Sequence, residues 1–336
     1  MTTAPREPHT SSTPSAGRPR AVVAGASGFI GVALVAALGE DGYDVATIGR
    51  GTSATVAWDD HAAVAALVDG AELLVNLAGR SVGCRYDDAH RQEIWSSRID
   101  TTELLNRVVA AATAPPALWL NASTGTIYRY ALDRPQSEAD GELGSGFSVD
   151  VARGWEAAFD AGDLPGTRRV ALRMAIVLGD GGAVRLLKRA ARFGVGGPQL
   201  DGRWFPHRHY RGIGPHATAN STAVHRSRGH QKFSWIHLDD VVGAVRHIRD
   251  TPSITGPVNL AVPTAATNRS VMAALRRRVG VPVGLPAPRW LLEIGMLVLR
   301  QESELVLKSR WVEPGVLTAT GYAFLRPELD DALAAS

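Results

Sequence analysis

The chain has 336 residues, a formal net charge of +3 and 45% apolar residues. This length suffices for one large α/β domain, or for one such domain with a smaller lobe. The charge is too small to predict a nucleic-acid partner. No apolar run reaches the roughly 18 residues that a membrane span needs, because the longest candidate, residues 290–299, contains Glu293.

The cysteine content and the start of the chain bear on its location. Cys84 is the only cysteine, so no internal disulfide can form and a reducing, cytoplasmic location is expected. Residues 1–19 are rich in Thr, Ser and Pro and are expected to form a disordered tail. They lack the apolar stretch of a secretory signal.

The first ordered segment combines a strand, three glycines and a helix. Residues 21–24 have strand character and residues 32–39 have helical periodicity, with Gly25, Gly28 and Gly31 between them. In a dinucleotide site such glycines allow a tight turn, close approach of the backbone to phosphate, and close packing of helix on strand. The free N–H groups and the helix dipole attract the anion. We therefore predict a dinucleotide site that includes Gly25, Ser27, Gly28, Phe29, Ile30 and Gly31; a plain glycine-rich turn is the alternative.

Strands and helices are expected to alternate as far as residue 180. Further strands are expected at residues 43–48, 72–77, 117–122 and 168–176, and helices at residues 62–68, 88–112 and 150–161. This βαβ order predicts an α/β fold with a doubly wound, parallel Rossmann sheet. The dinucleotide-binding domain is expected to span residues 20–180.

The later chain is less regular. A strand at residues 233–238, a helix at 241–249, a strand at 258–261 and a helix at 267–279 are expected. We predict a mixed region over residues 181–285, from which strands around residues 233–262 can join the sheet. Three prolines in residues 282–288 indicate a rigid linker. Residues 286–336 are expected to form a small helical domain, so that the whole chain has a Rossmann sheet and a smaller C-terminal α+β lobe.

Residues 202–229 form a segment without hydrophobic periodicity. It contains four histidines, five arginines and no acidic residue: His207, His209, His216, His225, Arg203, Arg208, Arg211, Arg226 and Arg228. A metal site, an anion-binding loop and a flexible surface insertion are the possible interpretations. The histidines lack the i, i+4 spacing of a helix, and no Cys, Asp or Glu lies among them, so no metal site is predicted. A flexible insertion is favoured.

Several motifs together resemble one family. Asn-Leu-Ala-Gly at residues 76–79 and Ser-Thr-Gly-Thr-Ile-Tyr at residues 123–128 resemble the extended short-chain dehydrogenase/reductases. An atypical branch is matched further by residues 93–102, 194–198, 233–240, 258–263 and 312–333. This branch is an epimerase-like family, often labelled nucleoside-diphosphate-sugar epimerase, with a C-terminal domain of unknown function. The resemblance covers residues 20–333, and residues 203–229 are an insertion relative to its pattern.

The resemblance implies further residues around the cofactor. Leu77, Ala78 and Gly79 would line it. Arg98, with Glu93 on the same helix, would face its ribose or phosphate side. A structural role for Arg98 as an ion-pair partner is the alternative.

The choice between NAD and NADP can be argued from charge. An NAD site usually has Asp or Glu at the end of the second strand to hold the ribose hydroxyls. Here that position is Arg50, which would hold a 2′-phosphate through a charge-assisted contact. Arg50 therefore predicts NADP(H), and a solvated surface arginine is the alternative.

The usual catalytic pair of such enzymes is missing. Typical members carry Tyr-x-x-x-Lys, but no tyrosine in this chain has Lys four residues later. Phe147 or Ser148 stands in the place of the tyrosine, and Val151 or Ala152 in the place of the lysine. The remaining candidates are Ser123, Thr124 and Tyr128. Thr124 matches the hydroxyl that polarises the substrate, and Tyr128 could supply a proton. Alternatively, Thr124 only contacts nicotinamide and Tyr128 packs in the turn.

These residues predict an NADP(H)-binding member of the branch. An oxidoreductase or epimerase-like enzyme acting on a small polar or carbonyl compound is expected. A catalytically weak NADP(H)-binding sensor or scaffold is the alternative. We expect a monomer or homodimer without nucleic-acid or membrane partners.

Overall fold

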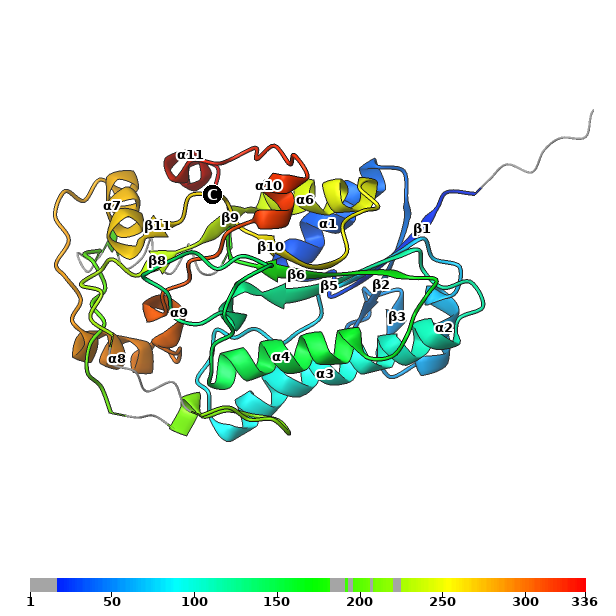
Figure 1. The fold of residues 1–336 in the computed structure, drawn as a ribbon, viewed down its shortest axis with the longest axis horizontal. Coiled ribbons are helices and arrows are strands. Elements are labelled where there is room, and N and C mark those ends of the chain that lie inside the picture. Colours follow the sequence, from blue (N-terminus) through cyan, green and yellow to red (C-terminus); the bar gives the residue numbers. More distant parts are fainter. Residues whose placement is uncertain (1–16, 182–190, 193–195, 206–207, 220–224) are drawn as a thin grey trace, which may run out of the picture.

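A seven-stranded sheet forms the centre of the molecule (Figure 1). The computed structural model describes residues 17–181, 191–192, 196–205, 208–219 and 225–336, so all of the predicted tail except residues 17–19 lies outside the described residues. The strand order is β10-β6-β5-β4-β1-β2-β3, with every neighbouring pair parallel. The strands are β1 (Arg20–Ala24), β2 (Asp44–Gly49), β3 (Val56–Ala57), β4 (Leu73–Asn76), β5 (Leu118–Thr124), β6 (Arg168–Met174) and β10 (Gly256–Leu260). The predicted doubly wound, parallel sheet is confirmed.

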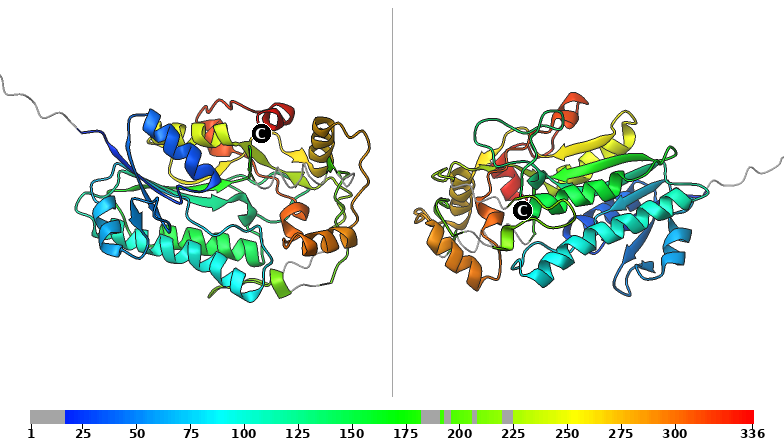
Figure 2. Two further views of the ribbon diagram at one scale, coloured as in Figure 1. Left: turned by 180° about the vertical axis from the view of Figure 1, so that it is seen from behind. Right: turned by 60° about the horizontal axis from the view of Figure 1, so that its bottom comes forward.

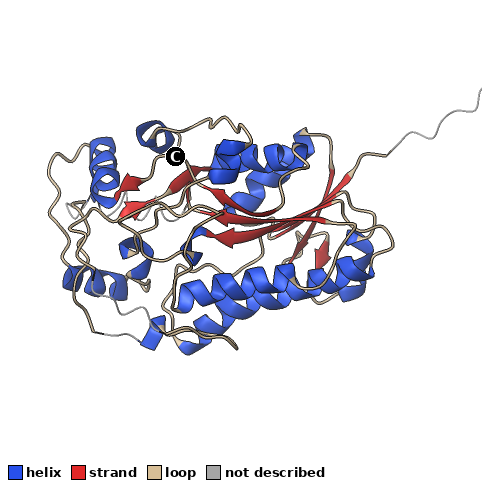
Figure 3. Cartoon of the chain, in the orientation of Figure 1, coloured by secondary structure: helices blue, strands red, loops and turns tan. Residues whose placement is uncertain are grey.

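Helices cover both faces of this sheet (Figure 3). One face carries α1 (Phe29–Glu40), α6 (Leu238–Asp250) and α10 (Gly315–Ala319), and the other carries α2 (His61–Val68), α3 (Asp88–Ala111) and α4 (Phe147–Asp160). Because side chains alternate along a strand, Ala21 and Val23 of β1 pack into the first layer and Val22 and Ala24 into the second. A strand buried on both faces must be apolar throughout, which explains why β1 reads as an unbroken apolar run.

The order in which the chain adds strands to the sheet reverses between β1 and β4. The chain runs outward from β1 through β2 to β3, then returns to β4 on the other side of β1. Ala24 and Asn76 are paired in register, and the N–H of Leu77 donates to the carbonyl of Ala24 at 2.9 Å. The segments that follow β1 and β4 therefore start side by side at the carboxyl edge, where ligands bind in such sheets.

A smaller lobe lies at the end of the molecule away from the start of β1, where α7, α8 and α9 gather (Figure 2). Its helices are α7 (Asn268–Val279), α8 (Arg289–Val298), α9 (Glu304–Leu307) and α11 (Leu329–Ala334). Its strand pairs are β8 (Lys232–Phe233) with β11 (Ala266–Thr267), antiparallel, and β7 (Ile176–Leu178) with β9 (Trp235–His237), parallel. Within the described ranges, no helix is both long and apolar enough to span a bilayer.

Two predicted strands are divided in the structure. Residues 168–176 form β6 and part of β7, and residues 233–238 form β8 and β9. The second division falls at Ser234, whose N–H donates to the carbonyl of Arg310 at 3.0 Å and whose hydroxyl accepts the N–H of Val312 at 2.8 Å. These bonds to the C-terminal segment interrupt the strand pairing. Among the described strands around residues 233–262, only β10 joins the central sheet.

The described part of the segment 202–229 is anchored to the helices beside the sheet. Asp150 of α4 is buried and accepts three hydrogen bonds: from the N–H of Ile213 (3.1 Å), and from the N–H (2.8 Å) and hydroxyl (2.7 Å) of Thr218. Arg91 of α3, also buried, donates to the carbonyls of His209 and Arg211. Buried charged groups of α3 and α4 therefore hold the backbone of these residues in place, and the flexible insertion over residues 202–229 stays a prediction.

We expect Asp150→Ala to detach residues 208–219 from α4. The change leaves two backbone N–H groups without their acceptor and should lower the free energy of unfolding by about 2–4 kcal/mol. Urea unfolding and limited proteolysis measure the two effects, with faster cleavage expected within residues 208–219. Asp163→Asn, at an exposed position just after α4, is the control. Unchanged stability and cleavage in Asp150→Ala would contradict the anchoring role.

Candidate functional site

A cavity of about 330 Å³ lies at the carboxyl ends of β1, β4 and β5. Ten of the predicted site residues line it: Gly25, Gly28, Phe29, Ile30, Gly31, Leu77, Gly79, Arg98, Ser123 and Thr124. Five predicted residues do not line it: Ser27, Arg50, Ala78, Glu93 and Tyr128. The structure thus brings the glycine turn, the segment after β4 and the end of β5 to one site.

The glycine turn is shaped by close backbone approach. Gly25 has a φ of +79°, and a Cβ there would lie 2.7 Å from the carbonyl carbon of Leu77. A Cβ on Gly31 would collide with the carbonyl oxygen of Gly25. Helix α1 begins after Gly28 without a side-chain cap and without an acidic residue in its first turn. Its first N–H groups therefore remain available to an anion in the cavity.

Arg98 is a partly buried cation in the wall of the cavity. One of its Nη atoms donates to the carbonyl of Ile94 at 3.1 Å, and its guanidinium lies 5.0 Å from the ring centre of Trp155. Burial lowers the pKa of Arg98 to about 10. Glu93 pairs with Arg80 instead, and Arg98 forms no ion pair with any residue in the described ranges. The alternative of Arg98 as a structural ion-pair partner is therefore not supported.

Arg50 lies just beyond the end of β2 and is exposed. It forms no hydrogen bond or ion pair with a described residue. The N–H of Gly25 donates to the carbonyl of Ile48 at 3.2 Å, so Arg50 follows the residue that touches the glycine turn by only two positions. Its guanidinium is thus free to meet a group that extends from the turn.

A buried polar network joins the elements below the cavity. The side-chain amide of Asn76 donates to Asn121 at 2.8 Å and to the hydroxyl of Thr102 at 3.0 Å. The same hydroxyl accepts the indole N–H of Trp155 at 3.0 Å, and the side-chain oxygen of Asn76 accepts the N–H of Ala78 at 3.1 Å. This network fixes the ends of β4 and β5 relative to α3 and α4, and it explains why Ala78 supports the site without lining it.

The hydroxyl groups at the cavity differ in whether their protons are already donated to a protein acceptor. Ser123 donates to Glu156 at 2.5 Å, and Ser148 donates to Glu304 at 2.8 Å. Thr124 accepts the N–H of Thr126 at 3.1 Å, and its own proton has no acceptor among the described residues. Thr126 also lines the cavity; its hydroxyl accepts from Arg310, and its proton likewise has no acceptor among the described residues. Thr124 and Thr126 can therefore both donate to a molecule in the cavity.

Tyr128 faces away from the cavity. It is buried, its hydroxyl donates to Asn259 at 2.9 Å and accepts from Arg173 at 2.9 Å, and burial raises the pKa of Tyr128. The prediction that Tyr128 supplies a proton does not fit this placement. The alternative, that Tyr128 packs in the turn, does.

The wall where Tyr-x-x-x-Lys would lie is largely apolar. Phe147, Ser148 and Val151 of α4 line the cavity. Tyr86, from the segment after β4, packs against Phe147 with ring centres 4.7 Å apart, and burial raises its pKa well above the usual range. Tyr86 was not among the predicted site residues, because no local sequence pattern distinguishes it from other tyrosines.

The C-terminal lobe completes the cavity. Leu305 and Arg310 line it, and Trp155 of α4 lies in the same wall. Neither Leu305 nor Arg310 was predicted, because both are distant in sequence from the glycine turn. The matched tail at residues 312–333 was the only signal near them.

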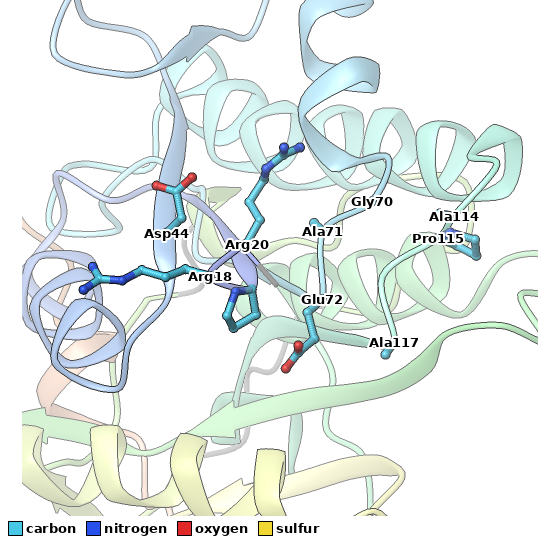
Figure 4. A pocket seen from close by; sticks show the side chains of 11 residues that line it. Arg18, Arg20, Asp44, Gly70, Ala71, Glu72, Ala114, Pro115 and Ala117 are labelled. Atoms are coloured by element: carbon cyan, nitrogen blue, oxygen red, sulfur yellow. The ribbon is translucent and has the colours of Figure 1, made fainter. Parts of the chain in front are cut away.

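A second cavity, of about 410 Å³, lies at the amino ends of the strands (Figure 4). In Figure 4 the carboxylates of Asp44 and Glu72 point in opposite directions, and Glu72 accepts the hydroxyl of Tyr43 at 2.8 Å. The charged groups that line this second cavity do not converge on one point. Ligands of parallel sheets bind at the opposite, carboxyl edge. No three His, Cys, Asp or Glu side chains in the described residues are placed to hold a metal ion.

The parallel sheet and the cavity at its switch point define a Rossmann-type nucleotide-binding protein. The chain belongs to the NAD dependent epimerase/dehydratase family, whose model matches residues 21–261. Residues 287–336 match a domain of unknown function, DUF1731. The resemblance to the atypical epimerase-like branch is confirmed.

Individual relatives extend this assignment over nearly the whole chain. The human epimerase family protein SDR39U1 is 30% identical, with 94% of this chain and 98% of that protein covered. Its crystal structure (isoform 2) with NADPH has a TM-score of 0.74, covering 94% of this chain and 97% of that one. A nucleoside-diphosphate sugar epimerase from Corynebacterium glutamicum is 25% identical with a TM-score of 0.69, covering 95% of this chain and 58% of that one.

Two glycines of α1 allow a matched test of the close approach. We expect Gly31→Ala to destabilise the protein, because its methyl group would meet the backbone of Gly25 and Ala26. Gly39→Ala, in the same helix with open space around it, should stabilise by about 0.5–1 kcal/mol because alanine favours a helix. Urea unfolding measures both. Equal effects of the two changes would contradict the packing described for the turn.

Proposed function

We propose that this cavity binds NADP(H). The observation that carries the proposal is one cavity lined both by the uncapped start of α1 and by Arg98, a partly buried cation without a carboxylate partner. Both features suit the phosphates and ribose of a dinucleotide. The crystal structure of the human relative with NADPH supports the same cofactor.

Arg50 supports the phosphorylated form of the cofactor. It stands where an NAD site would carry an acidic residue, and it has no described partner that would neutralise it. A 2′-phosphate would meet its guanidinium in a charge-assisted contact. The close approach at Gly25 and Gly31 shapes the turn at the start of α1, because a Cβ at either position would meet protein backbone.

For the activity, we propose an oxidoreductase or epimerase-like enzyme acting on a small polar or carbonyl compound. Bound NADP(H) supplies or accepts hydride. Thr124 donates its free hydroxyl proton as a hydrogen bond to the carbonyl oxygen. Ser123 is held by Glu156, which also forms an ion pair with Arg173 at 2.7 Å, and it positions this end of β5. The single cysteine supports a cytoplasmic location.

One observation favours a second candidate, a catalytically weak NADP(H)-binding sensor or scaffold. Apolar Phe147 and Val151 line the wall where the usual acid and base would stand, and Tyr128 is turned toward Asn259. A cavity with these side chains retains the cofactor contacts while offering few groups for proton transfer.

Charge reversal at Arg50 tests the choice of cofactor. We expect Arg50→Glu to raise the Kd for NADPH by about tenfold or more, because a carboxylate would repel the 2′-phosphate, and to change the Kd for NADH far less. Fluorescence titration measures both constants. Arg107→Glu, at an exposed site on α3, is the matched control. Equal losses for the two cofactors would exclude the assignment of Arg50 to the 2′-phosphate.

Turnover tests the activity. NADPH absorbance is followed against a panel of carbonyl compounds and nucleotide sugars. We expect Thr124→Ala to lower kcat/KM by about 100-fold, because it removes the donor to the carbonyl oxygen, with little change in NADPH affinity. Tyr128→Phe should keep kcat/KM within about threefold and lower stability by about 1 kcal/mol, because its hydroxyl only bridges buried groups. Tight NADPH binding without turnover on any compound would favour the sensor.

A further inference from the structure

Arg310 brings a second cation to the cavity from the C-terminal lobe. Its Nε donates to the hydroxyl of Thr126 at 2.9 Å, and one Nη donates to the carbonyl of Leu305 at 3.0 Å. Its backbone is held on both sides, because its N–H donates to the carbonyl of Lys232 at 2.9 Å and its carbonyl accepts the N–H of Ser234 at 3.0 Å. The guanidinium therefore has a fixed position in the cavity wall.

The charge of Arg310 is only partly offset by the protein, through the longer-range attraction of Glu304. No carboxylate among the described residues forms an ion pair with it, and only 9% of the residue is exposed. Burial lowers the pKa of Arg310. The carboxylate of Glu304 accepts the hydroxyl of Ser148 at 2.8 Å and forms no direct ion pair with Arg310. The second Nη group is thus a donor without a described acceptor.

Lys308 adds to this positive charge. Its ammonium donates to the carbonyl of Thr126 at 2.7 Å, and burial lowers its pKa to about 8. Two cations from one lobe therefore hold the turn η1 (Gly125–Ile127) and its flanking residue Thr124. Burying cations without carboxylate partners is costly, and an anion in the cavity would offset that cost.

The two arginines of the cavity contact different parts of its wall. Arg98 lies against Gly79, in the segment beside the glycine turn, where the cofactor is proposed to bind. Arg310 contacts Thr126 in the turn after β5, and the N–H of Thr126 donates to the proposed carbonyl donor Thr124, the last residue of β5. An anion on Arg310 would therefore lie on the substrate side.

We propose that Arg310 determines substrate specificity by binding an oxyanion, a carboxylate or a phosphate, of a small carbonyl substrate. The proposal rests on the proposed function, since it assumes that the cofactor occupies the other end of the cavity. The planar guanidinium offers N–H groups in the geometry that suits such anions. Because Thr124 and Arg310 both bond to Thr126, they lie close enough for one short molecule to place its carbonyl on Thr124 and its oxyanion on Arg310.

Binding of simple anions tests this site in the full chain. The protein is saturated with NADP⁺, so that the cofactor's own phosphates fill their sites, and is titrated by calorimetry with malonate, inorganic phosphate and uncharged malonamide. We expect malonate or phosphate to bind and malonamide not to bind, and the preferred anion identifies the substrate's acidic group. Arg310→Gln should weaken that binding by about tenfold or more, Arg310→Lys by less, because lysine keeps the charge without the planar fork.

The controls separate this proposal from the cofactor assignment. Arg300→Gln removes an exposed arginine from the same lobe and should bind anions like the unmodified protein. NADP⁺ affinity should stay within about threefold in Arg310→Gln, because Arg310 is placed away from the cofactor. If NADP⁺ itself fails to bind, the proposed function is wrong, and the same titration without cofactor still judges Arg310.

Two results would overturn the proposal. One is that malonate and phosphate bind no better than malonamide. The other is that Arg310→Gln binds them as well as the unmodified protein does. If Arg310→Gln does not fold, the comparison of Arg310→Lys with Arg300→Gln decides: equal anion affinity in these two variants would equally overturn it.

Discussion

The hydrogen bonds of Asn76 are the constraint on which the site depends. A buried amide must find partners, and here they come from β5, from α3 and from its own chain at Ala78. Thr102 extends the network to Trp155 of α4. Because every partner is buried, a shift of one element would leave polar groups unsatisfied. The network therefore sets the positions of Arg98, which leaves α3 toward the cavity, and of Thr124 at the end of β5.

The second wall of the cavity follows from a different constraint, the pairing of the C-terminal segment with the middle of the chain. Ser234 bonds to both Arg310 and Val312, so the segment that carries Arg310 is tied to the strands of the small lobe. That tie interrupts the strand expected at residues 233–238, and it also places a cation opposite the Rossmann sheet. The hydrogen bonds of Ser234 thus explain both why the expected strand is divided and why a guanidinium group lies in the wall of the cavity.

Local sequence patterns predicted the features that depend on interactions between residues close in sequence. The glycine turn and the central strands could be read from sequence, because apolar periodicity and close backbone approach act over a few residues. Arg98 was implied only by the family resemblance. Arg310 and Tyr86 could not, because their positions depend on contacts between distant segments. The insertion also looked unanchored, since it has no periodicity of its own; its anchor, Asp150, lies on α4 and accepts backbone N–H groups that any sequence would offer.

Motif similarity was a better guide to position than to chemistry. Ser123, Thr124 and Tyr128 belong to one matched motif, yet their hydroxyl groups face a carboxylate, the cavity and a buried amide in turn. Only the accounting of donors and acceptors separates them. The same accounting applies across the cavity. Apolar residues occupy the wall of the missing acid and base, so its free polar groups include the hydroxyls of Thr124 and Thr126, the first N–H groups of α1 and the guanidinium groups of Arg98 and Arg310. A molecule that satisfies all of them must be polar at both ends.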